Sequence, residues 1–229
     1  MDSKLNTVLS MFAVIGLIVL CVIAGAKLEQ KINLAETQET FKISEGNPVI
    51  IDAGHGGADA GKTGVNGEEE KNINLKISEK IKKLLIDDGI PVHMTREGDE
   101  RLAESQREDL KARTEIMNSG ALLAVSIHQN SYHDSSVWGG QVFYHTESEE
   151  GRKAAEMIQA ELNSLSPDHE KKIKSNDTYY ILKNTQVPAV IVECGFMSNY
   201  AEAEKLSSDE YQGEIAEAVT RGILHYIND

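Results

Sequence analysis

From residue 47 onward, short apolar runs alternate with longer stretches in which apolar residues recur every three or four positions. The short runs are rich in valine and isoleucine and are bounded by turn residues, which is typical of strands buried in a parallel sheet. Strands are therefore predicted at residues 48–53 (PVIIDA), 90–95 (IPVHMT), 122–128 (LLAVSIH), 139–145 (GGQVFYH) and 189–196 (AVIVECGF).

The longer stretches predict amphipathic helices between and after these strands. The first spans residues 68–89, ends at Gly89 and carries one apolar stripe. That stripe is formed by Ile73, Ile77, Ile81, Leu84 and Leu85. Further helices are predicted at about 103–119, closed by Gly120, at about 150–164 and at 209–228. The last of them turns its apolar face inward with Tyr211, Ile215, Val219, Gly222 and Tyr226.

The alternation of strands and helices at this spacing predicts an α/β fold in which a mostly parallel central sheet is flanked by helices. This pattern occupies residues 47–229, a length suited to a single domain with a core of its own. In such folds ligands bind beyond the carboxyl ends of the parallel strands, so functional side chains are expected there.

Residues 1–26 form a different kind of segment. No charged residue occurs between Lys4 and Lys27, and the apolar stretch from Val8 to Ala26 is long enough to cross a bilayer, which requires about 20 residues. Its last residues offer a small-residue cleavage pattern, yet the stretch exceeds the roughly 7–15 apolar residues usual in a signal peptide. We therefore expect a membrane anchor or a signal peptide, with the anchor favoured. The polar residues 27–46 are expected to form a stalk.

The overall charge narrows the choice of partner. A net charge of −14, from 37 acidic and 23 basic side chains, argues against nucleic acid because phosphate binding requires a basic surface. The two cysteines, Cys21 and Cys194, lie in the apolar N-terminal run and in a predicted buried strand. A disulfide between them is not expected, and the sequence shows no disulfide framework.

Polar residues follow three of the predicted strands at their carboxyl ends. His55 lies in the glycine-rich turn GHGGADAG after the first strand, His128 follows AVSI, and Glu193 closes AVIV. A phosphate-binding turn would need G-x-G-x-x-G or a lysine-bearing P-loop, and this turn has neither. A zinc site with an open position uses three protein ligands, often of the His/His/Glu kind. We therefore expect a metal site that still requires one carboxylate.

The candidate carboxylates are Glu68, Glu69 and Glu70, at the start of the first helix. Extending the buried stripe of that helix backwards by three or four residues reaches Glu69 or Glu70 and turns Glu68 away. Glu70 is preferred as the ligand. Glu68 and Glu69 are explained as an acidic first turn that complements the helix dipole.

With these candidate residues, the chain resembles the zinc-dependent N-acetylmuramoyl-L-alanine amidases of the amidase-3 family. The segments IDAGHGG, EEEKNINL, SIHQNS and VPAVIVECGFMSN occur in the family's order and at roughly its separations, within residues 47–228. The resemblance implies that His55, Glu70 and His128 bind Zn²⁺ and that Glu193 is catalytic. The chain departs from the common pattern at Gln129 and Cys194, where many relatives have alanine and an apolar residue; neither is a proposed ligand.

The implied reaction explains these residue types. Zinc lowers the pKa of a water towards about 7 and polarises the carbonyl, so amide hydrolysis becomes feasible at neutral pH. Glu193 would carry the proton to the leaving amine, and a purely structural role is less favourable because a buried carboxylate is costly without a partner. The bond cut would join the lactyl group of N-acetylmuramic acid to L-alanine in peptidoglycan. Asn130, two residues beyond His128, is a candidate to orient a ligand or touch substrate.

Other polar residues are assigned structural roles. Arg96 and Arg113 match positions where the family often has arginine and are expected to brace loops through carboxylate pairs. The remaining histidines are expected to be ordinary surface or edge residues: His93, His133, His145, His169 and His225.

The domain organisation expected from the resemblance is minimal: anchor or signal peptide at 1–26, stalk at 27–46 and amidase-3 catalytic domain at 47–229. A bare catalytic domain on a membrane anchor is similar to the sporulation amidases that act on spore-cortex peptidoglycan, where removal of stem peptides prepares muramic-δ-lactam formation for germination. This similarity implies an extracytoplasmic location, in a sporulating cell the forespore intermembrane space. Peptidoglycan, the membrane and an activating protein are the candidate partners.

Three alternatives remain open from the sequence. The first is a general cell-wall remodelling amidase. The second is a catalytically silent, zinc-stabilised wall-binding domain, which the presence of Glu193 argues against. The third is a zinc peptidase that cuts between stem amino acids, and analysis of reaction products separates it from an amidase.

Overall fold

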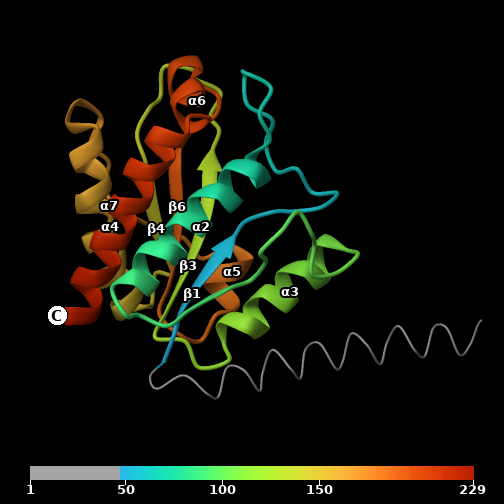
Figure 1. The fold of residues 1–229 in the computed structure, drawn as a ribbon, viewed down its shortest axis with the longest axis vertical. Helices are drawn as coiled ribbons and strands as arrows, with labels where there is room; N and C mark the ends of the chain where they lie inside the picture. Colours follow the sequence, from blue (N-terminus) through green and yellow to red (C-terminus); the bar gives the residue numbers. More distant parts are fainter. Residues whose placement is uncertain (1–46) are drawn as a thin grey trace, which may run out of the picture. The chain divides into compact units, whose positions relative to one another are not determined.

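A six-stranded sheet runs through residues 47–229, the part of the chain that the computed structural model describes (Figure 1). Its strand order is β2-β1-β3-β6-β4-β5. The strands are β1 (Val49–Ala53), β2 (Val92–Met94), β3 (Leu123–Asn130), β4 (Gln141–Tyr144), β5 (Lys174–Ser175) and β6 (Ala189–Phe196). Strands β2, β1, β3 and β6 are parallel, and β4 runs antiparallel to β6. The predicted mostly parallel sheet is confirmed, and the anchor and stalk predictions lie outside the described residues.

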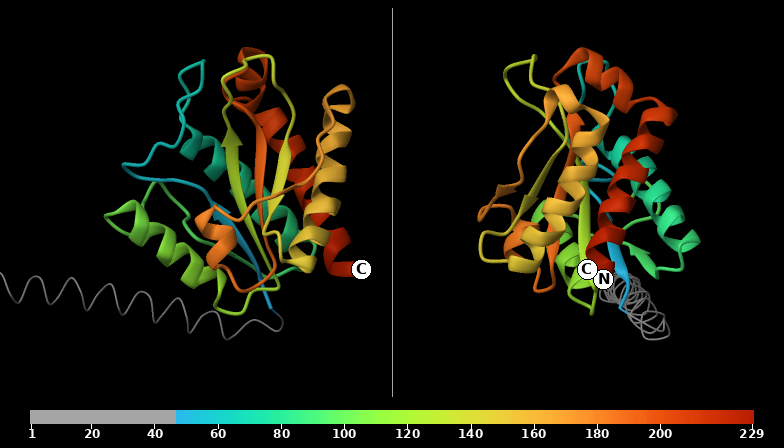
Figure 2. Two further views of the ribbon diagram at one scale, coloured as in Figure 1. Left: turned by 180° about the vertical axis from the view of Figure 1, so that it is seen from behind. Right: turned by 90° about the vertical axis from the view of Figure 1, so that its left-hand side faces the viewer.

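Helices cover both faces of the sheet (Figure 2). On one face, α2 and α4 both pack against α7; on the other, α3 packs against α5 and β1. The helices are α2 (Glu70–Asp87), α3 (Gln106–Met117), α4 (Glu149–Leu165), α5 (Tyr180–Asn184), α6 (Tyr200–Leu206) and α7 (Asp209–Asn228). The longer helices were predicted close to these bounds, whereas α5, α6 and β5 are too short to show a period. None of the helices within residues 47–229 has both the length and the apolar character needed to cross a bilayer.

The apolar core lies between the sheet and the layer formed by α2, α4 and α7. Ile73, Ile77 and Ile81 of α2 are fully buried, as the predicted stripe requires, and meet alternate residues of the central strands. Burying side chains of this kind contributes about 1.5–3 kcal/mol each to stability. The predicted inward face of α7 is also buried, so the helical periodicity identified the core correctly.

The opposite face of the sheet carries polar residues in register. Asp52 of β1 pairs with Ser126 of β3, and two positions further along His128 of β3 pairs with Glu193 of β6. Because directly paired residues share a face of a sheet, these side chains project together near the carboxyl ends of the strands. The fold therefore gathers its polar side chains where the α/β topology predicts a ligand site.

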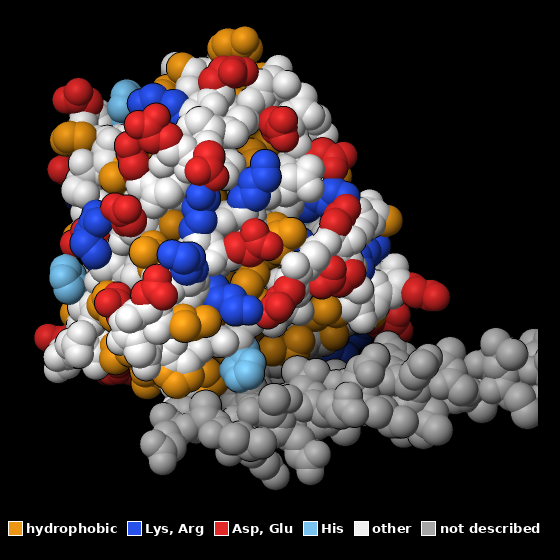
Figure 3. Space-filling model, viewed as in Figure 1, with side chains coloured by type: hydrophobic (Ala, Val, Ile, Leu, Met, Phe, Trp, Pro, Cys, Tyr) orange, Lys and Arg blue, Asp and Glu red, His pale blue; other side chains and the backbone are white. Residues whose placement is uncertain are grey.

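Charged side chains are mixed on the surface made by α2 and α7. Figure 3 shows lysine and arginine interspersed with aspartate and glutamate on this face of the described domain. Lys80 of α2 and Asp209 of α7 form one such pair, with Nζ and Oδ1 2.7 Å apart. Exposed pairs of this kind contribute little to stability, so the apolar core dominates the attachment of these helices to the sheet.

Two buried arginines brace the turn that follows β1. Arg113 of α3 is 2% exposed; its Nη1 donates to Asp52 at 2.7 Å and its Nε donates to Asp109 at 2.7 Å. Burial alone would raise the pKa of Asp52, but Arg113 and neighbouring hydroxyl groups hold it below its ordinary value. Arg96 donates to the carbonyl oxygens of Ala53 and Gly54 at 2.8 and 3.1 Å. The predicted carboxylate pairing is confirmed for Arg113, while Arg96 braces the turn through carbonyl oxygens instead.

A buried carboxylate, Glu202 of α6, ties that helix to the ends of the sheet. Its side chain accepts hydrogen bonds from the backbone N–H groups of Gly139 at 3.0 Å and Phe196 at 2.8 Å. A Cβ atom on Gly195 would lie 2.7 Å from Oε1 of Glu202, so a larger residue there would displace the carboxylate. Burial raises the pKa of Glu202 to about 7, although both hydrogen bonds and nearby lysines oppose the shift.

Replacing Arg113 with methionine should destabilise the domain by about 3–5 kcal/mol, because Asp52 would remain buried without its cation. Arg107→Met on the same helix is the control, since Arg107 is exposed, and should change stability by less than about 0.5 kcal/mol. Urea denaturation of both variants measures the free energy of unfolding. Equal losses in the two variants would show that the buried pair is not a major support of the fold.

Glu202 predicts a pH dependence of stability. Because its pKa rises from an ordinary 4.5 to about 7 on folding, its contribution is full below pH 4.5 and is lost as the pH rises to about 7. The loss should be on the order of 3 kcal/mol. Comparison of wild type with Glu202→Gln should show a difference in free energy of unfolding that changes over this range. The exposed neighbour variant Glu204→Gln should follow wild type, and a parallel wild-type and Glu202→Gln profile would refute the assignment.

Candidate active site

His55 occupies a strained position in the turn after β1. Its φ angle is +64°, in the left-handed region that residues other than glycine rarely adopt. The turn is held by reciprocal backbone hydrogen bonds between Gly56 and Asp59 and by Arg113 Nη2, which donates to the His55 carbonyl oxygen at 2.7 Å. The Asp59 carboxylate lies 3.1 Å from Nδ1 of the imidazole. Strain of this kind persists only where the surroundings fix it, and it is common at functional sites.

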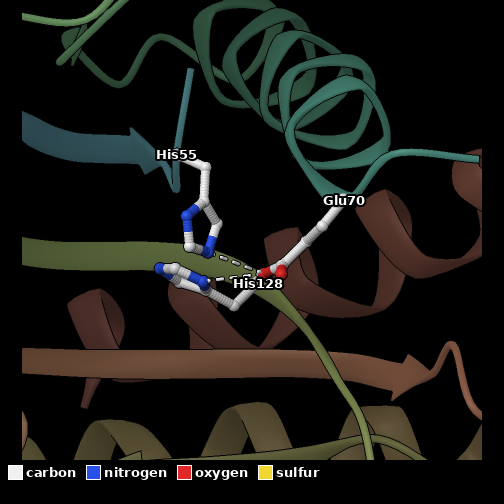
Figure 4. A group of neighbouring side chains, drawn as sticks. All are labelled: His55, Glu70 and His128. Atoms are coloured by element: carbon white, nitrogen blue, oxygen red, sulfur yellow. Dashed lines mark hydrogen bonds and ion pairs between the residues drawn. The ribbon is translucent and has the colours of Figure 1, made fainter. Parts of the chain in front are cut away.

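Glu70, the first residue of α2, joins both predicted histidines (Figure 4). It is 2% exposed, and its Oε1 lies 2.9 Å from Nδ1 of His128 and 3.3 Å from Nε2 of His55. The backbone N–H of Gln129 donates to Oε1 at 3.1 Å, and that of Lys62 donates to Oε2 at 2.9 Å. Each carboxylate oxygen is therefore aimed by the backbone of a separate segment.

The neighbouring glutamates do not share this position. Glu68 is exposed, and the Glu69 side chain is 43% exposed, with its carboxylate 3.5 Å from Nζ of Lys71. The structure thus brings Glu70, the preferred ligand of the sequence analysis, into contact with the two histidines and leaves Glu68 and Glu69 at the surface.

His128 lies in β3, next to an irregularity in its pairing with β6 between His128 and Asn130. Its imidazole packs edge-on against that of His55, with ring centroids 4.9 Å apart. A Cβ atom on Gly54 would collide with the His128 ring, so only glycine at that position leaves room for it. The first motif therefore supplies both a histidine and the space for the second one.

The three side chains fit a divalent metal such as zinc. His55, Glu70 and His128 each offer one ligand atom, and these atoms all lie within 4.8 Å of one another. Zinc bonds of about 2.0–2.1 Å in a tetrahedron place neighbouring ligand atoms roughly 3.3 Å apart, close to the 2.9 and 3.3 Å measured here. Two imidazole nitrogens and one carboxylate oxygen are also the donors that zinc prefers. The residues present are compatible with a site that keeps a fourth position open.

Charge links the same three groups. Burial would raise the pKa of Glu70, but the two imidazoles hold it well below its ordinary value. Burial would likewise lower the pKa of His128, yet the hydrogen bond with Glu70 raises it to about 9. The carboxylate therefore stays ionised and provides the negative charge of the site.

Glu193 lies beside this cluster on β6, directly paired with His128. Its Oε2 atom is shielded from solvent and has no hydrogen-bond partner among the described residues. Burial raises the pKa of Glu193 to about 7, and the negative charge of Glu70 adds to the effect, while the two histidines oppose it. A carboxyl group of this kind can exchange a proton near neutral pH.

Sequence reasoning missed the residues that support the cluster. Asn74, one turn after Glu70, donates to the Gly54 carbonyl oxygen at 3.1 Å and accepts from the Gln129 side chain at 3.1 Å. The signal was present, because Asn74 is a polar residue inside the apolar stripe of α2. Asp59 was missed as well, although it lies four residues after His55 in the same turn.

Asn130 lies at the end of β3, close to His128. Its Oδ1 atom accepts a hydrogen bond from the backbone N–H of Ser131 at 2.8 Å. The suggested contact with substrate stays a prediction. Cys194 is buried and forms no disulfide within the described residues.

Comparison with known proteins identifies the kind of enzyme that has this architecture. Residues 49–225 match the family described as N-acetylmuramoyl-L-alanine amidase. The germination-specific N-acetylmuramoyl-L-alanine amidase of Bacillus subtilis is 34% identical over 193 residues, which cover 80% of this chain and 81% of the relative.

Solved structures agree. The CwlD amidase from Clostridioides difficile, determined in complex with the GerS lipoprotein, is 35% identical with a TM-score of 0.77, and the match covers 80% of this chain and 99% of that one. The amidase AmiC2 of Nostoc punctiforme is 29% identical with a TM-score of 0.70, over 80% and 98% of the two chains. This chain therefore belongs to the amidase-3 family and is an N-acetylmuramoyl-L-alanine amidase, a peptidoglycan hydrolase that cuts between N-acetylmuramic acid and L-alanine.

Proposed function

We propose that this enzyme uses Zn²⁺ to remove stem peptides from spore-cortex peptidoglycan, ahead of muramic-δ-lactam formation. The observation that carries the zinc dependence is the convergence of His55, Glu70 and His128 beside Glu193. The cortex assignment is supported by similarity to the germination-specific amidase of Bacillus subtilis and to the CwlD amidase.

His55 Nε2, a Glu70 carboxylate oxygen and His128 Nδ1 would hold the metal. When bound, zinc supplies positive charge that polarises the amide carbonyl and makes a water molecule more acidic. Asp59 accepts a hydrogen bond from Nδ1 of His55 and so leaves Nε2 available as a ligand. The backbone N–H groups of Lys62 and Gln129 fix the orientation of the Glu70 carboxylate, which lowers the reorganisation that metal binding would require.

Glu193 is proposed as the proton carrier of the reaction. The oxygen of the attacking water bonds to the carbonyl carbon of the lactyl group, and Glu193 accepts the water's proton at its carboxylate. The bond between that carbon and the nitrogen of L-alanine then breaks, and Glu193 returns the proton to the leaving nitrogen. A pKa of about 7 suits both directions of transfer at neutral pH. The Oε2 atom has no competing partner among residues 47–229, so it is available for this role.

The location follows from the substrate, because peptidoglycan lies outside the cytoplasm. Residues 1–26 are proposed to hold the enzyme on the membrane, with residues 27–46 as a stalk and the catalytic domain on the extracytoplasmic side. In a sporulating cell this side is the forespore intermembrane space. The CwlD amidase was solved in complex with the GerS lipoprotein, which supports a lipoprotein as a candidate partner of this enzyme.

Digestion of purified cortex peptidoglycan tests the proposal. Mass analysis should find intact stem peptides with a free L-alanine amino group and glycan strands with free lactyl carboxylates. Shorter peptides would indicate a zinc peptidase, and binding without any release would indicate a silent wall-binding domain. Equal release from cortex and vegetative peptidoglycan would favour a general wall-remodelling amidase.

Glu70→Gln should abolish zinc binding, because the neutral amide is a poor ligand although it keeps the size of the side chain. Glu69→Gln is the matched control and should keep one zinc per chain. Zinc content after dialysis, measured by atomic emission, checks the prediction. Loss of zinc in the Glu69 variant with retention in the Glu70 variant would show that the ligand is assigned one residue too late.

Glu193→Gln should leave zinc content and melting temperature close to wild type but lower the rate of stem-peptide release by about 10²–10⁴-fold. Glutamine keeps the shape of the side chain and cannot accept the proton. Zinc content, thermal unfolding and product release are measured on the same preparation. Loss of the metal would instead make Glu193 a ligand, and a near-normal rate would mean that another group carries the proton.

A further inference from the structure

Tyr179 packs on the face of the sheet that carries Glu193. Its ring packs against Phe143 of β4, with centroids 5.5 Å apart and an interplanar angle of 64°. Phe143 is paired with Ile191 of β6, two residues before Glu193, and residues two apart on a strand share a face. Since β6 lies between β3 and β4, His128 and Phe143 flank β6 on this face, and the partner of Phe143 on β6 lies two residues before Glu193.

The backbone of Tyr179 is fixed to the sheet. Asn176 donates its backbone N–H to the carbonyl oxygen of Tyr144, the last residue of β4, at 2.9 Å. The Asn176 side chain then accepts from the backbone N–H of Tyr179 at 2.8 Å, and Lys183 donates to the Tyr179 carbonyl oxygen at 3.0 Å. The side chain remains 37% exposed, so a bound molecule can reach it from the solvent side.

The hydroxyl of Tyr179 makes no hydrogen bond with any residue in the described part of the chain. Tyr211 and Tyr226, which are more buried, have the side-chain partners Ser166 and Glu150. Burial raises the pKa of Tyr179, and the negative charge of Glu193 adds to this shift. The phenol therefore stays protonated at neutral pH and retains a proton to donate.

We propose that the Tyr179 hydroxyl binds the substrate and donates a hydrogen bond to the carbonyl oxygen of the amide that is cut. This inference rests on the proposed function, in which the substrate amide binds at Glu193, on the same face of the sheet as Tyr179. Negative charge develops on the carbonyl oxygen when water adds to the carbon, and a donor placed at that oxygen stabilises the transition state more than the ground state. A neutral donor also avoids the fixed ion pair that a lysine or arginine would form with Glu193.

Tyr179→Phe tests the inference, since it removes one oxygen atom and keeps the ring against Phe143. The full chain loaded with zinc should lose about 10²–10³-fold in kcat on peptidoglycan, with KM changed by less than about threefold. Zinc content and melting temperature should equal those of wild type. Tyr200→Phe is the control, because Tyr200 is 66% exposed at the start of α6, and should have wild-type kinetics.

Other results would overturn the inference. A wild-type kcat in Tyr179→Phe would exclude the donor role. A raised KM with unchanged kcat would mean that Tyr179 binds the substrate and the transition state equally well, which also contradicts the donor role. A shift of the acidic limb of the pH–rate profile would mean that Tyr179 acts through Glu193 instead of on the substrate. If wild type itself released no stem peptide, the proposed function would fail and this inference with it. An active wild type with an unaffected Tyr179→Phe variant would refute only the role of Tyr179.

Discussion

The buried ion pair between Arg113 and Asp52 is the constraint on which the site depends. A guanidinium at this depth is costly to desolvate, and an apolar pair of similar volume would often be as stable. What an apolar pair could not do is bind backbone carbonyl oxygens, and Arg113 holds those of Ala53 and His55 in addition to its carboxylates. Left-handed geometry at a histidine costs about 1–3 kcal/mol, so the turn needs such a clamp. The Arg113–Asp52 pair thus fixes the backbone of the turn and, with it, the orientation of the His55 imidazole.

The remaining parts of the site are attached to the same frame. The Glu70 carboxylate accepts hydrogen bonds from the backbone N–H of Lys62 in the glycine-rich loop and from that of Gln129 in β3. Its position therefore depends on both segments. Asn74 joins α2 to the carbonyl oxygen of Gly54. These contacts are made by protein groups, so the fold itself holds the two histidines and the carboxylate close together. Preorganisation of this kind is what a hydrolytic site requires for electrostatic stabilisation.

The sequence was sufficient to predict the elements in which a pattern of apolar residues extends over many positions. The strand at 189–196 and the helix at 209–228 were predicted at the bounds observed, and the topology rule led from strand ends to His55, His128 and Glu193. The apolar face of the first helix excluded Glu68 and left Glu69 or Glu70, and the family resemblance indicated Glu70. The family match supplied the reaction, which spacing alone did not specify.

The contacts that were missed join segments far apart in the chain. The hydrogen bond from Arg113 to the His55 carbonyl oxygen joins residues 58 positions apart, and the one from Gly139 to Glu202 joins residues 63 positions apart. A local sequence pattern cannot predict either contact. Arg96 was expected to meet a carboxylate because charge is visible in a sequence, whereas the carbonyl oxygens it binds are not. Tyr179 precedes a five-residue helix and follows a two-residue strand, both too short for periodicity to detect.

The most direct test of this account is a crystal structure of the zinc-loaded chain with anomalous diffraction recorded at the zinc absorption edge. We predict one zinc ion bound by Nε2 of His55, a carboxylate oxygen of Glu70 and Nδ1 of His128, with His55 still in its left-handed conformation. Glu193 should face the ion without coordinating it. A zinc ion bound elsewhere, direct coordination by Glu193, or a turn rebuilt on metal binding would contradict the claim that the fold sets this site in advance.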